Sequence, residues 1–418
     1  MECGEPVGDR VQRAALRMSL VGFYGGGVLA LSGLFLPPAG DGRPRLLVAP
    51  EAHARAMALG FVALFILSFL CRMVPRLTRS PLAHPRLAEL GAAALLAATL
   101  LDTAGAMTWG GVGPLLLGGL WLLAVVGWAG SLGSTWLGRT APLPWFAGWI
   151  GGGLLTLGLC VGVASASALL GWTDVLGRVP AATLLGALTP IAAGLSVKML
   201  PAMSGVGPAD RGAATVPLLL VAAVGATVSL GMLVGQPFVA LVGLLGLAVL
   251  SGSALKGTGW LRLRRDGDER LQGIRMEPDA RALRWSARLA WAALGAGLLV
   301  LIVGLGATVS GQHELAGRPL REAHVLGVHL VGAGFLVTLM LGVGQRLLPG
   351  FLRADVRWPR VRYAVFFGML VSLLLRVAAG LVPAALPWAL HAALGALLAS
   401  VALFHVQVSP SIRSPAEE

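Results

Sequence analysis

Residues 51–75 read EAHARAMALGFVALFILSFLCRMVP, an apolar run that opens with Glu-Ala-His and closes with a basic residue three positions before a proline. Residues 322–349 have the same opening and the same close, ending in Arg-Leu-Leu-Pro. A third copy of the close, Lys-Met-Leu-Pro at residues 198–201, lacks the histidine. Self-similarity of this kind predicts an architecture built from repeated units.

The match between the first and third copies extends beyond the closing proline. A Pro-Arg pair begins ten residues later in each, at positions 85 and 359. Seventeen residues beyond each of these prolines, an ionisable residue interrupts an apolar run: Asp102 in the first copy and Arg376 in the third.

The composition excludes an ordinary soluble domain, because 56% of the residues are hydrophobic, 12% are charged and the mean hydropathy is +0.81. Apolar runs of about 20 residues, the length that crosses a bilayer as a helix, recur throughout. The alternating pattern of a membrane β-barrel is absent, so we predict an all-α polytopic bundle. Its twelve predicted transmembrane helices are roughly 18–40, 52–74, 87–110, 113–136, 144–170, 182–203, 214–234, 236–255, 286–310, 322–348, 362–382 and 387–407.

Twelve spans and three copies of the signature predict three pseudo-repeated four-helix arcs, with the signature on the second helix of each. The arcs cover about 18–140, 144–255 and 285–408, separated in part by a cytoplasmic loop at 256–284, within one integral membrane domain, 1–418.

The net charge of +13 reflects the basic residues of alternate loops. Eight of them lie between Lys256 and Arg284, and others precede the first span or follow the second, fourth and tenth. This positive-inside bias predicts that both termini are cytoplasmic. It favours the lipid bilayer over a nucleic acid as the partner of this charge.

Four of the seven histidines lie at the outer ends of predicted spans two, ten and twelve: His53, His324, His329 and His391. The other three lie outside this layer: His84, His313 and His405. Ionisable groups within membrane spans are rare and usually functional, so the four are candidate ligands of a metal.

His53 and His324 occupy matching places in two copies of the unit, so they can approach each other across the bundle. Paired imidazoles suit the axial positions of a low-spin haem iron. His324 and His329 are five residues apart and point about 140° away from each other on a helix. Either can therefore be the second ligand, and the other can serve a neighbouring site. The simpler alternative is that these histidines only form interhelical hydrogen bonds.

Asp102 and Arg376 have two interpretations. They neutralise each other or are solvated in a cavity, or Arg376 binds an anionic group such as a haem propionate. Met199 and Met203 are spaced for a soft copper ion, although filling the core is the more ordinary role of methionine.

The architecture and the histidines on spans two and ten resemble the catalytic subunit of haem-copper oxidases. In detail, the stretches 51–75 and 324–346 resemble the NnrS family, membrane proteins associated with nitric oxide and denitrification that contain haem and copper. The resemblance implies a bacterial cytoplasmic (inner) membrane protein with haem b as cofactor, copper as a second metal, and quinol or a redox partner protein as electron donor. It also implies His53 and His324 as axial ligands, with His329 as the differently facing histidine of span ten.

The sequence departs from haem-copper oxidases where their dinuclear centre lies. Predicted spans six and seven contain neither histidine nor tyrosine, and Asp102 is nearly the only acidic residue within a span. We therefore predict a haem b protein of NnrS type and not a proton-pumping oxidase. The alternatives are a membrane nitric oxide reductase or oxidase-like enzyme with an atypical haem or copper site, a twelve-helix secondary transporter, and an assembly protein with a vestigial site. A transporter is disfavoured because the repeat spans four helices rather than six.

Overall fold

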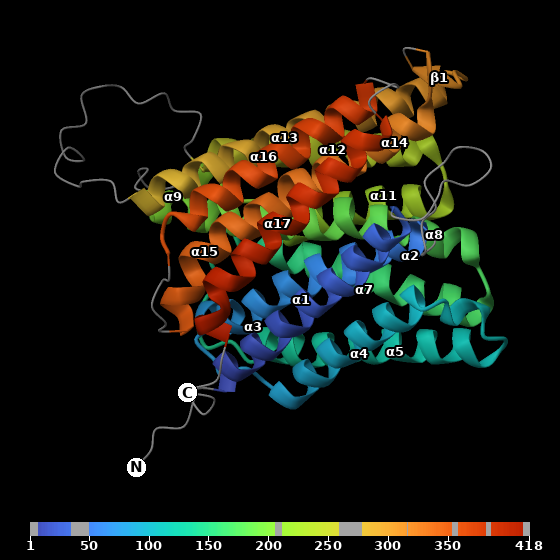
Figure 1. Ribbon diagram of the computed structural model, residues 1–418. Coiled ribbons are helices and arrows are strands. Elements are labelled where there is room, and N and C mark those ends of the chain that lie inside the picture. The colour runs from blue at the N-terminus through green and yellow to red at the C-terminus, as the bar shows by residue number, and fades with distance from the viewer. Residues whose placement is uncertain are drawn as a thin grey trace.

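The computed structural model describes residues 7–34, 50–204, 211–258, 278–315, 317–352, 358–381 and 386–412. These residues form a bundle of long helices (Figure 1). Nine of the helices in this described part are long and apolar enough to cross a membrane by length and composition. The predicted all-α polytopic membrane bundle is confirmed.

The helical segments run in chain order through the three arcs. The first arc contains α1 (Val7–Leu34), α2 (Pro50–Arg55), η1 (Ala56–Ala63), α3 (Leu64–Thr78), α4 (Pro85–Thr103), η2 (Ala106–Thr108), α5 (Val112–Trp128), η3 (Ala129–Gly133) and α6 (Ser134–Leu137). The second contains α7 (Ala147–Leu170), α8 (Thr173–Ala182), η4 (Thr183–Leu188), α9 (Thr189–Ser204), α10 (Arg211–Ala214), α11 (Leu218–Val234) and α12 (Pro237–Gly257). The third contains α13 (Pro278–Val309), the short strands β1 (Glu314–Leu315) and β2 (Arg318–Pro319), α14 (Leu320–His329), η6 (Leu330–Val337), α15 (Thr338–Leu352), α16 (Val361–Leu381) and α17 (Leu386–Ile412).

The sixth span begins nine residues before its predicted start, at Thr173 instead of 182. Pro180, which precedes the predicted start, lies inside this helix. Proline removes a backbone donor and crowds the preceding turn. The π-helical segment η4, which begins three residues later at Thr183, lies where this disturbance can be absorbed.

A π-helical segment occurs in the second span of every arc: η1, η4 and η6. The three segments contact one another pairwise, so they meet at the centre of the bundle. π-Helical turns are rare and are often found at functional sites. Their shared position gives the middle of the protein an approximately threefold arrangement.

Helix α1 packs so closely against η1 that their backbones are in contact. A Cβ added to Gly22 would lie 2.2 Å from the carbonyl oxygen of Gly60, and one added to Gly26 would lie 2.7 Å from Cβ of Ala56. Only glycine therefore fits at Gly22 and Gly26, which are four residues apart on one face of α1. The close approach brings the carbonyl groups of α1 within reach of the second span.

We call the end of the bundle at which α1 begins and α17 ends the proximal end, and the opposite end the distal end (Figure 1). At the proximal end the first signature arginine, Arg72, pairs with Asp9 of α1. Arg72 and Arg76 also lie over the ring of Phe351, at 5.1 and 5.3 Å from its centroid. These contacts tie the first arc to the third. The histidine-bearing segments α2 and α14 lie at the distal end.

Candidate functional site

His53 lies in α2, three residues before η1 begins. Its Nδ1 is 3.0 Å from the carbonyl oxygen of Gly26. A carbonyl only accepts, so Nδ1 carries the proton and the unprotonated nitrogen of the neutral ring is Nε2. This hydrogen bond from the non-ligating nitrogen is the one that orients and tunes a metal-binding imidazole.

His329 is the last residue of α14, directly before η6. Its Nδ1 is 2.8 Å from the carbonyl oxygen of Val325, so this ring too presents Nε2 as its free nitrogen. The side chain of His329 is exposed.

The π-helical segments that follow His53 and His329, η1 and η6, contact each other, and the charges of His53 and of Arg376 in α16 act on His329. In the described part of the chain His324 has no hydrogen-bond partner that would fix its tautomer. His391 lies in α17. Of the predicted histidines, His53 and His329 are the two whose Nδ1 is bound to a backbone carbonyl.

His405, which the sequence leaves outside the histidine layer, is nevertheless in a polar contact across helices. Its Nδ1 is 3.1 Å from the hydroxyl oxygen of Tyr24. This contact joins α17 to α1. Tyr24 lies two residues before Gly26, whose carbonyl accepts the hydrogen bond from His53.

Arg376 has a buried Nε atom without a hydrogen-bond partner. No carboxylate of the described residues forms an ion pair with it. The Arg376 side chain as a whole is half-buried, and a buried Nε–H group without an acceptor is costly. Beside His329, such a group is suited to an anionic substituent of a bound molecule.

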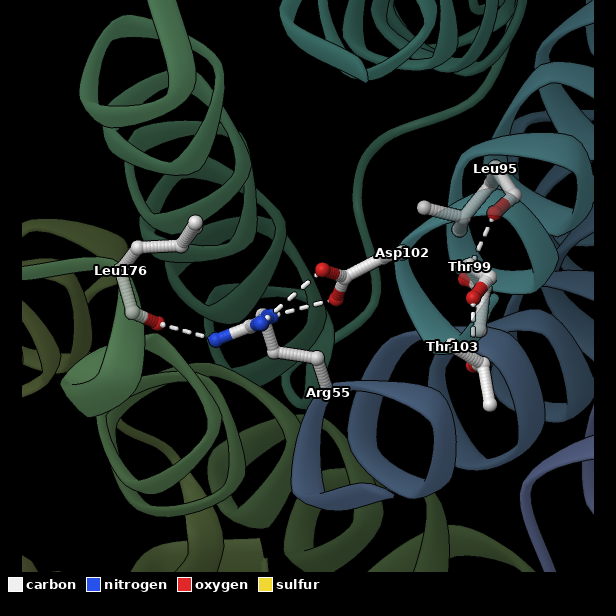
Figure 2. A network of polar contacts seen from close by, with 6 residues as sticks. All are labelled: Arg55, Leu95, Thr99, Asp102, Thr103 and Leu176. Atoms are coloured by element: carbon white, nitrogen blue, oxygen red, sulfur yellow. Dashed lines mark hydrogen bonds and ion pairs between the residues drawn. The ribbon is translucent and has the colours of Figure 1, made fainter. Parts of the chain in front are cut away.

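One interpretation of the sequence was that Asp102 and Arg376 neutralise each other. The structure contradicts this interpretation. Asp102 pairs with Arg55 of α2 through two hydrogen bonds, Nε to Oδ2 at 2.6 Å and Nη2 to Oδ1 at 3.0 Å. The Nη1 of Arg55 donates to the carbonyl oxygen of Leu176 at 3.3 Å. Figure 2 shows the guanidinium between this carbonyl and the carboxylate, so one side chain joins the second, third and sixth spans.

Arg55 was not among the predicted site residues. The signal was present, because a carboxylate within an apolar span requires a cation, and predicted span two contains two arginines, Arg55 and Arg72. The side chains of Arg55 and Asp102 are only 7% and 2% exposed. The nearby hydroxyl groups of Thr99 and Thr103 donate to carbonyls of their own helix, at Leu95 and Thr99, and so leave the carboxylate to Arg55.

Within the described residues, no three histidine, cysteine, aspartate or glutamate side chains lie close enough together to hold a metal ion. A copper site with three or more such ligands therefore has no counterpart in this part of the chain. Met199 lines a small apolar cavity of about 50 Å³ with Phe65, Phe69 and Leu339, which is consistent with the core-filling role of methionine.

The residues at the distal end fit a haem held by two imidazoles. Two neutral rings with Nδ1 bound to carbonyls leave two Nε2 atoms for iron, which needs no third protein ligand. The unpartnered Nε of Arg376 supplies the cation that a haem propionate would pair with.

No family model matches the sequence, and no curated protein matches it. Among solved structures, a haem-copper terminal oxidase determined as a dimer by cryo-electron microscopy is similar, with a TM-score of 0.71 and 11% sequence identity over 98% of this chain and 85% of that chain. At this identity the likeness concerns the fold, and the chain accordingly has the helical membrane fold found in a haem-copper terminal oxidase.

Proposed function

We propose that this protein binds haem b in the membrane, with His53 of span two and His329 of span ten as axial ligands. The observation that carries the proposal is that both imidazole rings are in the same tautomer, with the proton on Nδ1. Each Nδ1 is held by a backbone carbonyl, and the charge of His53 acts on His329. The fold shared with a haem-copper terminal oxidase supports the same reading.

The residues around the proposed site have distinct roles. Gly26 and Val325 orient the imidazoles through their carbonyls, and Arg376 offers a charge-assisted hydrogen bond to a propionate. The haem, when bound, would supply one-electron redox chemistry. The surrounding apolar helices exclude water, which is the protein's means of tuning the potential of such a group.

The biological setting that we propose is a response to nitric oxide or denitrification, as in the NnrS family. It rests on the resemblance of the stretches around His53 and His324 to that family. Two tightly bound imidazoles make an electron-transfer haem, whereas nitric oxide needs an open position on the iron. Nitric oxide acting on the iron therefore requires one imidazole to be displaced.

The proposal is tested by a pyridine haemochrome assay and elemental analysis of the detergent-purified protein. We expect haem b with a low-spin Soret spectrum. His53→Ala and His329→Ala should each abolish the low-spin signal, because each removes one of the two imidazoles that would hold the iron.

His324→Ala is the matched control, since it removes an imidazole from the same helix and should leave the spectrum intact. If His324→Ala loses the low-spin signal and His329→Ala retains it, then His324 is the second ligand and His329 is not. A colourless preparation without metal would refute haem binding, and copper in addition to haem would favour the enzyme alternative.

A further inference from the structure

A second cavity lies in the first half of the chain, away from the histidines. It has a volume of about 300 Å³ and is bounded mainly by α5, η3 and α6 on one side and by α7 on the other. Its wall is almost wholly apolar and includes Trp128, Leu132, Trp136 and Leu154. Neither the proposed haem site nor the Arg55–Asp102 pair uses it.

Helices α5 and α7 are in close contact towards the distal end. There Gly118 packs against Leu169, and the Ser165 hydroxyl donates to the Gly118 carbonyl oxygen at 2.7 Å. Towards the proximal end two glycines of the cavity wall, Gly133 and Gly158, face open space, since a Cβ at either would have no neighbour within 4 Å. The π-helical η3 lies in this stretch of the wall.

The shape of the cavity suits a chain molecule. Its wall extends on one side from Val125 to Leu137, which is about 18 Å along the helix axis at a rise of 1.5 Å per residue. Two residues of the wall, Leu137 and Leu155, are 79% and 60% exposed, so the cavity is open sideways, towards the lipid. Apolar cavities do not hold water well, and a hydrocarbon chain can enter this one from the bilayer.

Positive charge lies at the proximal mouth of the cavity. Arg139 follows Leu137 by two residues, and its Nη1 is 3.4 Å from the carbonyl oxygen of Trp136. The next residue, Thr140, donates its hydroxyl to the carbonyl oxygen of Arg79 at 3.0 Å, which places Arg79 beside it. Both arginine side chains are exposed, and no carboxylate of the described residues pairs with either.

We propose that this cavity binds an anionic phospholipid, with one acyl chain between α5 and α7 and the phosphate group on Arg79 and Arg139. The apolar groove takes the chain, and two guanidinium groups provide the donors that phosphate oxygens accept. Aromatic residues such as Trp136 are common at this level of a membrane protein. The bound lipid would fill the cavity between these two spans.

Native mass spectrometry of the purified, delipidated protein tests the proposal, with phosphatidylglycerol and phosphatidylcholine added in separate titrations. We expect one tightly bound phosphatidylglycerol, and binding of phosphatidylcholine that is at least about tenfold weaker. Gly158→Phe, which fills the cavity, and Arg79→Glu combined with Arg139→Glu should each weaken phosphatidylglycerol binding by about tenfold or more.

The controls are Gly119→Phe, which adds the same ring at an open position of α5 outside the cavity, and Arg360→Glu, an exposed arginine of the third arc. Both should bind the lipid as the unaltered protein does. Unchanged binding in Gly158→Phe would overturn the acyl-chain site, and equal affinity for the two lipids would overturn the anionic headgroup. If Gly158→Phe fails to fold, the exposed arginine variants decide the question alone.

Discussion

The first and last arcs of this protein hold two polar groups at corresponding positions, with opposite consequences. Arg55 and His329 are each the last residue before a π-helical segment, and each lies 17 residues before its signature arginine. Asp102 and Arg376 each lie 27 residues after the signature proline. In the first arc the two groups are opposite charges that neutralise each other. In the last arc they are an imidazole and a guanidinium, which cannot.

The middle arc has neither group. The corresponding positions are Ala181 and Val228, and Val228 is fully buried. The corresponding positions thus hold an internal ion pair in the first arc, two apolar residues in the middle arc, and an imidazole and a guanidinium in the last arc. Only in the first arc do the two groups neutralise each other.

The largest effect is expected from separating the buried pair of the first arc. Arg55→Leu or Asp102→Leu alone should destabilise the protein by about 3–5 kcal/mol, because each leaves an uncompensated buried charge. The double variant should recover most of that loss. Thermal unfolding in detergent measures the three free energies, and equal costs for the single and double variants would show that the pair does not act as a unit.

The next effect concerns the unpartnered cation of the last arc. If haem is bound as proposed, Arg376→Leu should lower its midpoint potential by about 60 mV or more, since removing a nearby positive charge favours the oxidised iron and about 1.4 kcal/mol corresponds to 59 mV for one electron. Arg376→Lys keeps the charge and should shift the potential less. Redox titration of both variants makes the measurement, and identical potentials would return Arg376 to a structural role.

A smaller effect should follow from disturbing the carbonyl that orients His53. Gly26→Ala places a methyl group against Ala56, and relieving such a contact typically costs about 1–3 kcal/mol. The shift of α1 should weaken the Gly26–His53 hydrogen bond and broaden the haem spectrum. Gly395→Ala adds the same methyl group inside a helix where nothing lies within 4 Å, so it should not destabilise the protein and should leave the spectrum unchanged.

The smallest effect is expected from Thr103→Val beside the first-arc pair. Its hydroxyl hydrogen-bonds to the carbonyl of Thr99 in its own helix, so the loss should be about 1 kcal/mol or less. A loss comparable to that of Asp102→Leu would mean that the hydroxyl supports the carboxylate after all.

Much of the fold could be predicted because it depends on local patterns. Apolar runs of membrane-spanning length give the helices, and the repeated signature indicates which spans are equivalent. The start of span six was wrong because the helix begins before Pro180 and continues through it. The π-helical segments have no sequence pattern that distinguishes them from α-helix.

The predicted ligands depend on how the repeats are aligned. The Glu-Ala-His match paired His53 with His324, but α14 is longer than α2, and the register of the basic residue and proline pairs Arg55 with His329 instead. The two registers differ by three residues, nearly one helical turn, and a sequence offers no means of choosing between them. Which side chains face a common interior depends on how the helices rotate about their axes.

Hydropathy and spacing are properties of single helices, so they were enough to predict a helical membrane bundle of repeated units. The pairing of Asp102 with Arg55 became evident only from the packed fold. Charges in a low-dielectric interior interact with whichever group is nearest in space, and nearness between spans is set only when the helices pack.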